Sequence, residues 1–305
     1  MERAAGLDIF KTRENDPRDD MTYQTIVSAE TLAAALQASP APVVLDCSFE
    51  LTNPDAGRQA YDAGHLPGAF YVHLDQVLSA AKTGLNGRHP LPVRETFADA
   101  MARLGVNDDT QVIACDNAGG MYAARLWWML RWAGHGAVAV LDGGIAAWKA
   151  AGRPLSTETP APLAAGNFSL RRSLVATLSY ADIRANIDNP GKLVLDARAP
   201  DRFRGENETL DKIGGHIPGA RNRLFKDNLS ADGRFKPAEQ LKLEFDAITG
   251  GRPASELVSQ CGSGVTACHN LLAMEIAGLK GAALYPGSWS EYSAQPDAAI
   301  ATGSA

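Results

Sequence analysis

Residues 256–278 read ELVSQCGSGVTACHNLLAMEIAG and combine three structural signals in one short stretch. A short apolar run leads into a loop with two glycines, and the loop leads into an apolar segment long enough for a helix. A strand that passes through such a turn into a helix is typical of α/β proteins with a mainly parallel sheet. Ligands of these sheets bind at the carboxyl ends of the strands. Cys261, the first residue of the loop, is therefore predicted to lie in a functional site.

The chain repeats itself. VVLDCSFE at 43–50 resembles LVLDARAP at 193–200, and AGHLPGAF at 63–70 resembles GGHIPGAR at 214–221. Farther along, QVIACD at 111–116 matches ELVSQC at 256–261, and DGGIAAW at 142–148 matches PGSWSEY at 286–292. The four matches keep the same order at offsets of 150, 151, 145 and 144 residues. Such regularity indicates an internal duplication.

The duplication predicts two tandem α/β domains, each a mainly parallel sheet flanked by helices. We place the first at residues 22–152 and the second at 173–300, joined by a linker at 153–172 that is rich in proline, alanine and small polar residues. Residues 1–21 are charged and are predicted to form a mobile extension.

Composition limits the classes of partner. A net charge of −6 and a pI near 5.5 argue against nucleic acid or an anionic membrane surface. No segment approaches the roughly 20 apolar residues that span a bilayer, and the N-terminus lacks the apolar core of a signal peptide, so we expect a cytoplasmic protein. The 4 cysteines show no CxxC spacing, so neither a zinc site nor a disulfide framework is expected.

The loop after Cys261 is suited to holding an anion. Its glycines let successive backbone N–H groups point inward, and the following helix adds free N–H groups and the positive end of its dipole. These donors favour a thiolate or a persulfide on the cysteine. The alternative is a small buried cysteine, which is how we interpret Cys268 on the helix. The predicted loop residues are Gly262, Ser263, Gly264, Val265 and Thr266.

Two neighbouring positions refine this interpretation. A phosphatase with such a loop needs an arginine six residues after the cysteine to hold the phosphate. This chain has Ala267 there, which argues against a phosphatase. In the first repeat the cysteine position is occupied by Asp116. Its carboxylate supplies a fixed anion to the N–H groups but cannot attack sulfur as a thiolate does. We therefore predict that Asp116 fills a retired site, with an ordinary surface aspartate as the alternative.

The duplication and three of its segments resemble the two-domain rhodanese family. These segments are CGSGVTA at 261–267, the upstream turn GHIPGA at 215–220 and GSWSEY at 287–292. That family comprises thiosulfate and 3-mercaptopyruvate sulfurtransferases. The resemblance implies that Cys261 carries a persulfide and passes sulfur from a small anionic donor to cyanide, thioredoxin or a low-molecular-weight thiol. It also implies a silent N-terminal domain and no metal or organic cofactor. A non-catalytic sulfur-carrier module is the alternative from another class.

The resemblance further implies that Arg202 binds the anionic end of the donor. It implies acid–base roles for His65 and Asp55, together with the loop serine, although the histidine turn occurs in both repeats and so favours a structural role. Residues 206–214 contain Lys212 but not the second arginine of mercaptopyruvate enzymes, and the loop lacks the basic residues of thiosulfate enzymes. The donor stays open between a 3-mercaptopyruvate enzyme, which the neutral loop slightly favours, and a thiosulfate-specific rhodanese. For Arg88 and His89, in NGRHPLP at 86–92, we predict a rigid turn, with an approach to the cleft as the alternative.

Overall fold

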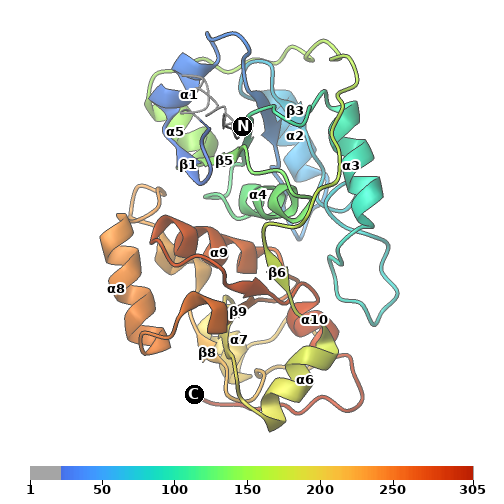
Figure 1. Ribbon diagram of the computed structural model, residues 1–305, viewed down its shortest axis with the longest axis vertical. Coiled ribbons are helices and arrows are strands. Elements are labelled where there is room, and N and C mark those ends of the chain that lie inside the picture. Colours follow the sequence, from blue (N-terminus) through green and yellow to red (C-terminus); the bar gives the residue numbers. More distant parts are fainter. Residues whose placement is uncertain (1–21, 305) are drawn as a thin grey trace, which may run out of the picture.

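The computed structural model describes residues 22–304, which form two α/β domains stacked along the long axis of the molecule (Figure 1). The extension predicted over residues 1–21 lies outside the described part of the chain. The first domain occupies the upper half of the view and the second the lower half.

Both domains have the same parallel sheet. The strand order is β1-β5-β4-β2-β3 in the first and β6-β10-β9-β7-β8 in the second, and every pairing is parallel. The first domain contains β1 (Ile26–Val27), α1 (Ala29–Ala35), β2 (Val43–Asp46), α2 (Ala56–Ala63), β3 (Phe70–Tyr71), α3 (Arg94–Arg103), β4 (Val112–Cys115), α4 (Ala123–Trp132), β5 (Val138–Leu141) and α5 (Gly144–Ala150). The second contains β6 (Ala176–Thr177), α6 (Tyr180–Asp188), β7 (Leu193–Asp196), α7 (Pro200–Arg204), β8 (Arg221–Asn222), α8 (Ala238–Thr249), β9 (Leu257–Gln260), α9 (Thr266–Ile276), β10 (Ala283–Leu284) and α10 (Ser288–Tyr292), with short 3-10 helices at Phe225–Asn228 and Ala254–Glu256.

The apolar side chains of the central strands explain why these segments form buried strands. All residues of β2, β4, β7 and β9 are buried, because helices cover both faces of each sheet. Continuous apolar runs such as VVLD and VIAC fit strands of this kind, and the sequence prediction for them is confirmed. Helix α6 begins with a reciprocal capping box between Ser179 and Asp182, which satisfies two backbone N–H groups at its start.

One hydrophobic cluster spans the two domains, and each domain also has a separate cluster of its own. Helices α4 and α9 pack against each other at the middle of the molecule (Figure 1). Trp127 and Trp128 on α4 are almost fully buried and belong to the same cluster as Leu271 and Met274 on α9. The tryptophans therefore serve domain-interface packing, and the cavity described below lies at this interface.

The predicted linker follows the surface of the first domain. Ser156 pairs with His65 as an isolated bridge, the Gly166 amide donates to the Ala102 carbonyl, and the Arg171 amide donates to the Ala133 carbonyl. These bonds fix the path of the chain between α5 and β6.

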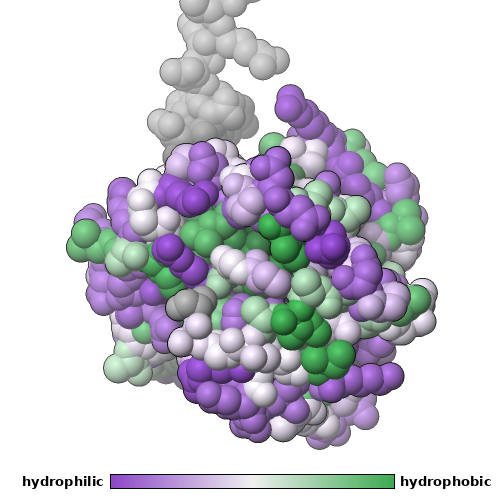
Figure 2. Space-filling model, turned by 90° about the horizontal axis from the view of Figure 1, so that it is seen from below, coloured by the Kyte–Doolittle hydropathy of each residue, from purple (hydrophilic) through white to green (hydrophobic). Residues whose placement is uncertain are grey.

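None of the helices in residues 22–304 is long and apolar enough to cross a membrane. Figure 2 shows the end of the molecule formed by the second domain, where hydrophobic residues occur in small groups between hydrophilic ones. Isolated apolar groups of this kind are normal on a protein surface.

Candidate active site

Cys261 lies directly after β9 and begins the loop that leads into α9. Its Sγ accepts a hydrogen bond of 3.1 Å from the Gly264 amide. Its own amide donates to Ser288 Oγ at 3.0 Å, and its carbonyl accepts from the Trp289 amide. Ser288 has a positive φ of 54°, a conformation that is strained for a residue with a side chain. The start of α10 therefore fixes the position of the cysteine.

The loop needs glycine at position 264. Gly264 has a φ of +78°, and a Cβ there would lie 2.3 Å from the Pro286 carbonyl oxygen. The turn directs amides toward the sulfur, and within residues 22–304 the amides of Gly262, Ser263, Val265 and Thr266 have no recorded protein acceptor. These groups are free to stabilise negative charge on Cys261 or on a second sulfur bound to it.

Cys261 borders a cavity of about 360 Å³ between the two domains. The second domain contributes the cysteine loop, α7 and the segment after β8, and the first contributes segments after β2, β3 and β4. The lining residues are Leu51, Leu74, Arg88, His89, Met121, Tyr122, Ala197, Arg198, Ala199, Arg202, Leu210, Leu224, Phe225, Lys226, Cys261, Gly262, Ser263, Val265 and Thr266.

A histidine of the first domain meets the cysteine loop. His89 Nδ1 lies 2.7 Å from Ser263 Oγ, and His89 Nε2 lies 3.5 Å from Asp75 Oδ1. Burial, followed by the nearby charge of Arg125, lowers the pKa of His89 to about 3, so the ring is neutral at pH 7. With its N–H toward Asp75, the ring accepts the hydroxyl proton of Ser263. The structure thus forms a polar chain of three side chains beside the sulfur.

His65 and Asp55, the acid–base residues implied by resemblance, do not line this cavity. His65 stacks on Tyr61 at 3.8 Å, and its ring nitrogens lie 2.8 and 3.1 Å from the carbonyl oxygens of Tyr61 and Glu158. His216 makes the equivalent stack on Phe203 in the second domain. Both histidines hold their turns, as a motif present in both repeats suggests. The histidine beside Ser263 is His89, which we predicted to belong to a rigid turn.

Arg202 does line the cavity, and it is joined there by Arg88 of the first domain. Both guanidinium groups point at Gly262, because a Cβ on that glycine would lie 2.6 Å from Arg88 Nη2 and 3.5 Å from Arg202 Nη2. Arg202 pairs with Glu208 at 2.9 Å. Arg88 reaches this place because its segment docks on the second domain, with its amide donating to Ser290 Oγ at 3.0 Å.

A further guanidinium, that of Arg125 on α4, lies under the loop. It is fully buried and donates to the carbonyl oxygens of Gly264, Leu78 and His89. Within residues 22–304 no carboxylate is recorded in an ion pair with it. Burial lowers the pKa of Arg125, and the nearby sulfurs of Cys268 and Cys261 act in the opposite direction. Arg125 is therefore a buried cation that three carbonyl oxygens hold beside the cysteine loop.

In the first domain, Asp116 occupies the place that Cys261 has in the second. The carboxylate is fully buried and accepts four backbone N–H bonds: Oδ1 from Ala118 and Gly120 at 2.8 Å, and Oδ2 from Tyr122 at 2.8 Å and Ala123 at 2.9 Å. This is the arrangement expected of a carboxylate filling an anion-binding loop. A surface aspartate is excluded.

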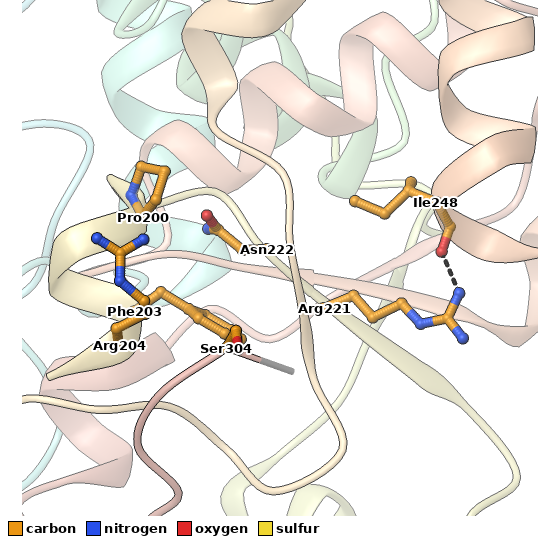
Figure 3. A pocket seen from close by; sticks show the side chains of 7 residues that line it. All are labelled: Pro200, Phe203, Arg204, Arg221, Asn222, Ile248 and Ser304. Carbon is orange, nitrogen blue, oxygen red and sulfur yellow. Dashed lines mark hydrogen bonds between the residues drawn. The ribbon is translucent and has the colours of Figure 1, made fainter.

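Another hollow lies beside the edge strand β8, between α7 and the end of α8 (Figure 3). Arg221 donates to the carbonyl of Ile248, another residue of its lining, and Arg204 pairs with Glu206. Its lining contains no cysteine and no histidine. Across residues 22–304, no group of three or more His, Cys, Asp or Glu side chains is placed to hold a metal ion. The domain-interface cavity is therefore the candidate active site.

Known proteins share this architecture. The sequence profile of the Rhodanese-like domain matches residues 28–151 and again 179–295. The chain is 46% identical over 285 residues to a probable 3-mercaptopyruvate sulfurtransferase of Pseudomonas aeruginosa, covering 93% of this chain and 100% of that protein. It is 36% identical over 285 residues to a putative thiosulfate sulfurtransferase of Mycobacterium tuberculosis, covering 92% and 98%. The structure of 3-mercaptopyruvate sulfurtransferase from Leishmania major matches with a TM-score of 0.79 and 30% identity, covering 88% of this chain and 74% of that one.

The duplicated sheet, the cysteine loop and these matches define the class: the chain belongs to the rhodanese family, with two tandem rhodanese-like domains. Within that family it is a transferase enzyme, a sulfurtransferase, that acts on a sulfur donor and a sulfur acceptor.

Proposed function

We propose that the enzyme transfers sulfur from 3-mercaptopyruvate to a thiol or to cyanide through a persulfide on Cys261. The observation that carries this proposal is the sulfur of Cys261 at the wall of the interface cavity, with the Gly264 amide already bonded to it and further loop amides free. The relative with 46% identity, named a probable 3-mercaptopyruvate sulfurtransferase, supports this donor.

In the first half-reaction, the Cys261 thiolate attacks the sulfur of the donor. The new S–S bond forms as the bond between that sulfur and C3 of the donor breaks, and the electron pair passes to C3. Pyruvate leaves as its enolate, which takes the proton that the donor thiol has lost. The negative charge of the persulfide is held by the loop amides.

Ser263 is placed to transfer that proton. Its hydroxyl lies 2.7 Å from the neutral His89 ring, so it can pass a proton to the enolate and recover one through the ring. Asp75, 3.5 Å from the other ring nitrogen, orients the imidazole. Arg202 and Arg88 offer guanidinium groups to the anionic end of the donor.

In the second half-reaction, the acceptor attacks the outer sulfur and regenerates the thiolate, which makes the cycle a ping-pong one. The acceptors we propose are cyanide, thioredoxin and low-molecular-weight thiols. The cytoplasm is the proposed location, because its reducing conditions keep the four free cysteines reduced.

We propose that the first domain is catalytically silent and walls the active site. Asp116 fixes the amides of its own loop, and the side chain of Tyr122 from that same loop lines the cavity around Cys261. The loop that begins at Asp116 thus forms part of the pocket around Cys261.

Thiosulfate is the second candidate donor. The name of the M. tuberculosis relative and the two guanidinium groups beside Gly262 favour it. With this donor, Cys261 attacks the outer sulfur of thiosulfate, the S–S bond of the donor breaks and sulfite leaves.

The test is thiocyanate formation from cyanide, measured with each donor for the wild type, Cys261→Ser and Cys268→Ala. We expect a higher kcat/KM with 3-mercaptopyruvate and a loss of at least about a thousandfold in Cys261→Ser, as for removal of a nucleophile. Cys268 is fully buried on α9, and burial raises its pKa to about 12, so Cys268→Ala should keep most of the activity. Turnover that survives in Cys261→Ser would refute the proposal.

A further inference from the structure

A carboxylate joins the two guanidinium groups that face the donor. Asp211 pairs through Oδ1 with Arg88 of the first domain and through Oδ2, at 3.3 Å, with Arg202 of the second. Its side chain is only 7% exposed, and it does not line the cavity itself. Asp211 therefore lies behind the arginines and ties the two domains together across the donor site.

This carboxylate changes the charge of the donor site. The cations that line the cavity are Arg88, Arg198, Arg202 and Lys226. The carboxylates bonded to these guanidinium groups are Asp196, Glu208 and Asp211. Four cations and three carboxylates leave one unit of positive charge, and the buried Arg125 under the cysteine loop adds a second. The Cys261 thiolate cancels one of the two. A donor with one negative charge fits such a site better than a donor with two.

We propose that Asp211 is a specificity-determining residue that favours a singly charged donor over a doubly charged one. The inference rests on the proposed function and sharpens its choice of donor. At neutral pH, 3-mercaptopyruvate carries one carboxylate and thiosulfate carries two negative charges. Asp211 repels both through the arginines, and it repels thiosulfate about twice as strongly.

The size of the effect follows from Coulomb's law. An anion held on the cavity side of the guanidinium groups lies on the order of 7 Å from the carboxylate behind them, where one unit charge changes binding by roughly tenfold at an effective dielectric constant near 40. Removing the charge of Asp211 should therefore raise affinity for a dianion about tenfold more than for a monoanion. The direction of the change in the donor ratio identifies this charge effect. A loss of arginine positioning would weaken binding of the dianion more than that of the monoanion and lower the ratio, whereas removing the charge of Asp211 raises it.

The experiment compares Asp211→Asn, Arg88→Gln and Glu206→Gln with the wild type. For each we measure kcat/KM with thiosulfate and with 3-mercaptopyruvate, and take the ratio. We expect the ratio to rise about tenfold in Asp211→Asn and to fall by a similar factor in Arg88→Gln, which removes a cation from the same site. Glu206 belongs to the same segment but is exposed and pairs with Arg204, outside the cavity, so Glu206→Gln should leave the ratio unchanged.

A binding measurement separates this inference from the proposed function. In Cys261→Ser, which cannot form a persulfide, calorimetry gives dissociation constants for thiosulfate as the dianion and pyruvate as the monoanion. Adding Asp211→Asn should strengthen thiosulfate binding about tenfold relative to pyruvate. An unchanged ratio in both assays would overturn the selector role of Asp211. Absence of turnover in the wild type with both donors would instead count against the proposed function, and the binding ratio would still decide the inference.

Discussion

The loops that follow β4 and β9 begin at equivalent positions of two related sheets, but the hydrogen bonds of their backbone amides differ. In the first domain, two carboxylate oxygens of Asp116 accept four N–H groups, and the donors extend to the first residue of α4. In the second, the single sulfur of Cys261 accepts from Gly264. The two carboxylate oxygens of Asp116 occupy four amides of its loop, whereas a single sulfur atom leaves amides available for further negative charge.

The largest effect is expected from removing the carboxylate of Asp116. Asp116→Ala leaves four N–H groups without their acceptor, most of them buried, so we expect a loss of about 3–5 kcal/mol in the free energy of unfolding. Denaturant unfolding measures it, with Asp62→Ala, at an exposed pair with Arg58, as the control. A loss below about 1 kcal/mol, the scale of an exposed pair, would show that the loop does not depend on the carboxylate.

A smaller effect is expected from the glycines at matching places in the two loops. Gly264→Ala would bring a Cβ within 2.3 Å of a backbone oxygen and displace the amide bonded to Cys261, and a shift of about 1 Å can lower kcat/KM by roughly a hundredfold. Gly119 also has a positive φ, but its Cβ would meet only the Leu229 side chain, at 3.0 Å. Gly119→Ala should therefore keep activity within about threefold, since positive φ alone costs roughly 1 kcal/mol of stability. Equal losses in both variants would contradict the difference drawn between the loops.

The last prediction concerns His89, which contacts the cysteine loop of the second domain through Ser263. His89 has a pKa of about 3 in the folded protein against about 6.5 when unfolded, so the unfolded state binds more protons between these values. Stability therefore falls as the pH drops from about 6.5 toward 3. His89→Gln should make this slope shallower by up to about 1.4 kcal/mol per pH unit, measured by denaturant unfolding from pH 7 to pH 4. A slope identical to that of the wild type would mean that His89 is not held neutral.

The parts that the sequence predicted are local in the chain. The parallel sheets, the strands at 43–46 and 112–115, the position of Cys261 and the role of Asp116 each follow from a short segment or from the comparison of two repeats. A run of buried apolar residues or a glycine turn acts on its own neighbours, so its pattern survives in the linear sequence.

The parts that it did not predict depend on contacts between domains. His89 and Ser263 are 174 residues apart, and Arg88 is 123 residues from Asp211. The resemblance to the family directed attention to His65, whereas the presence of its turn in both copies already favoured the structural contact that both domains share. The useful signal was a difference between the copies: NGRH at 86–89 aligns with DGRF at 232–235, so only the first copy has a histidine at this place.

The hydrophobic cluster that α4 and α9 share has a consequence for how the protein unfolds and refolds. Because buried side chains of both helices belong to one cluster, separating the two domains would expose Trp127, Trp128, Leu271 and Met274 together. The two duplicated domains are therefore not independent of each other. We expect each domain to stabilise the other through this cluster, so that the domain with Asp116 contributes to the stability of the domain with Cys261.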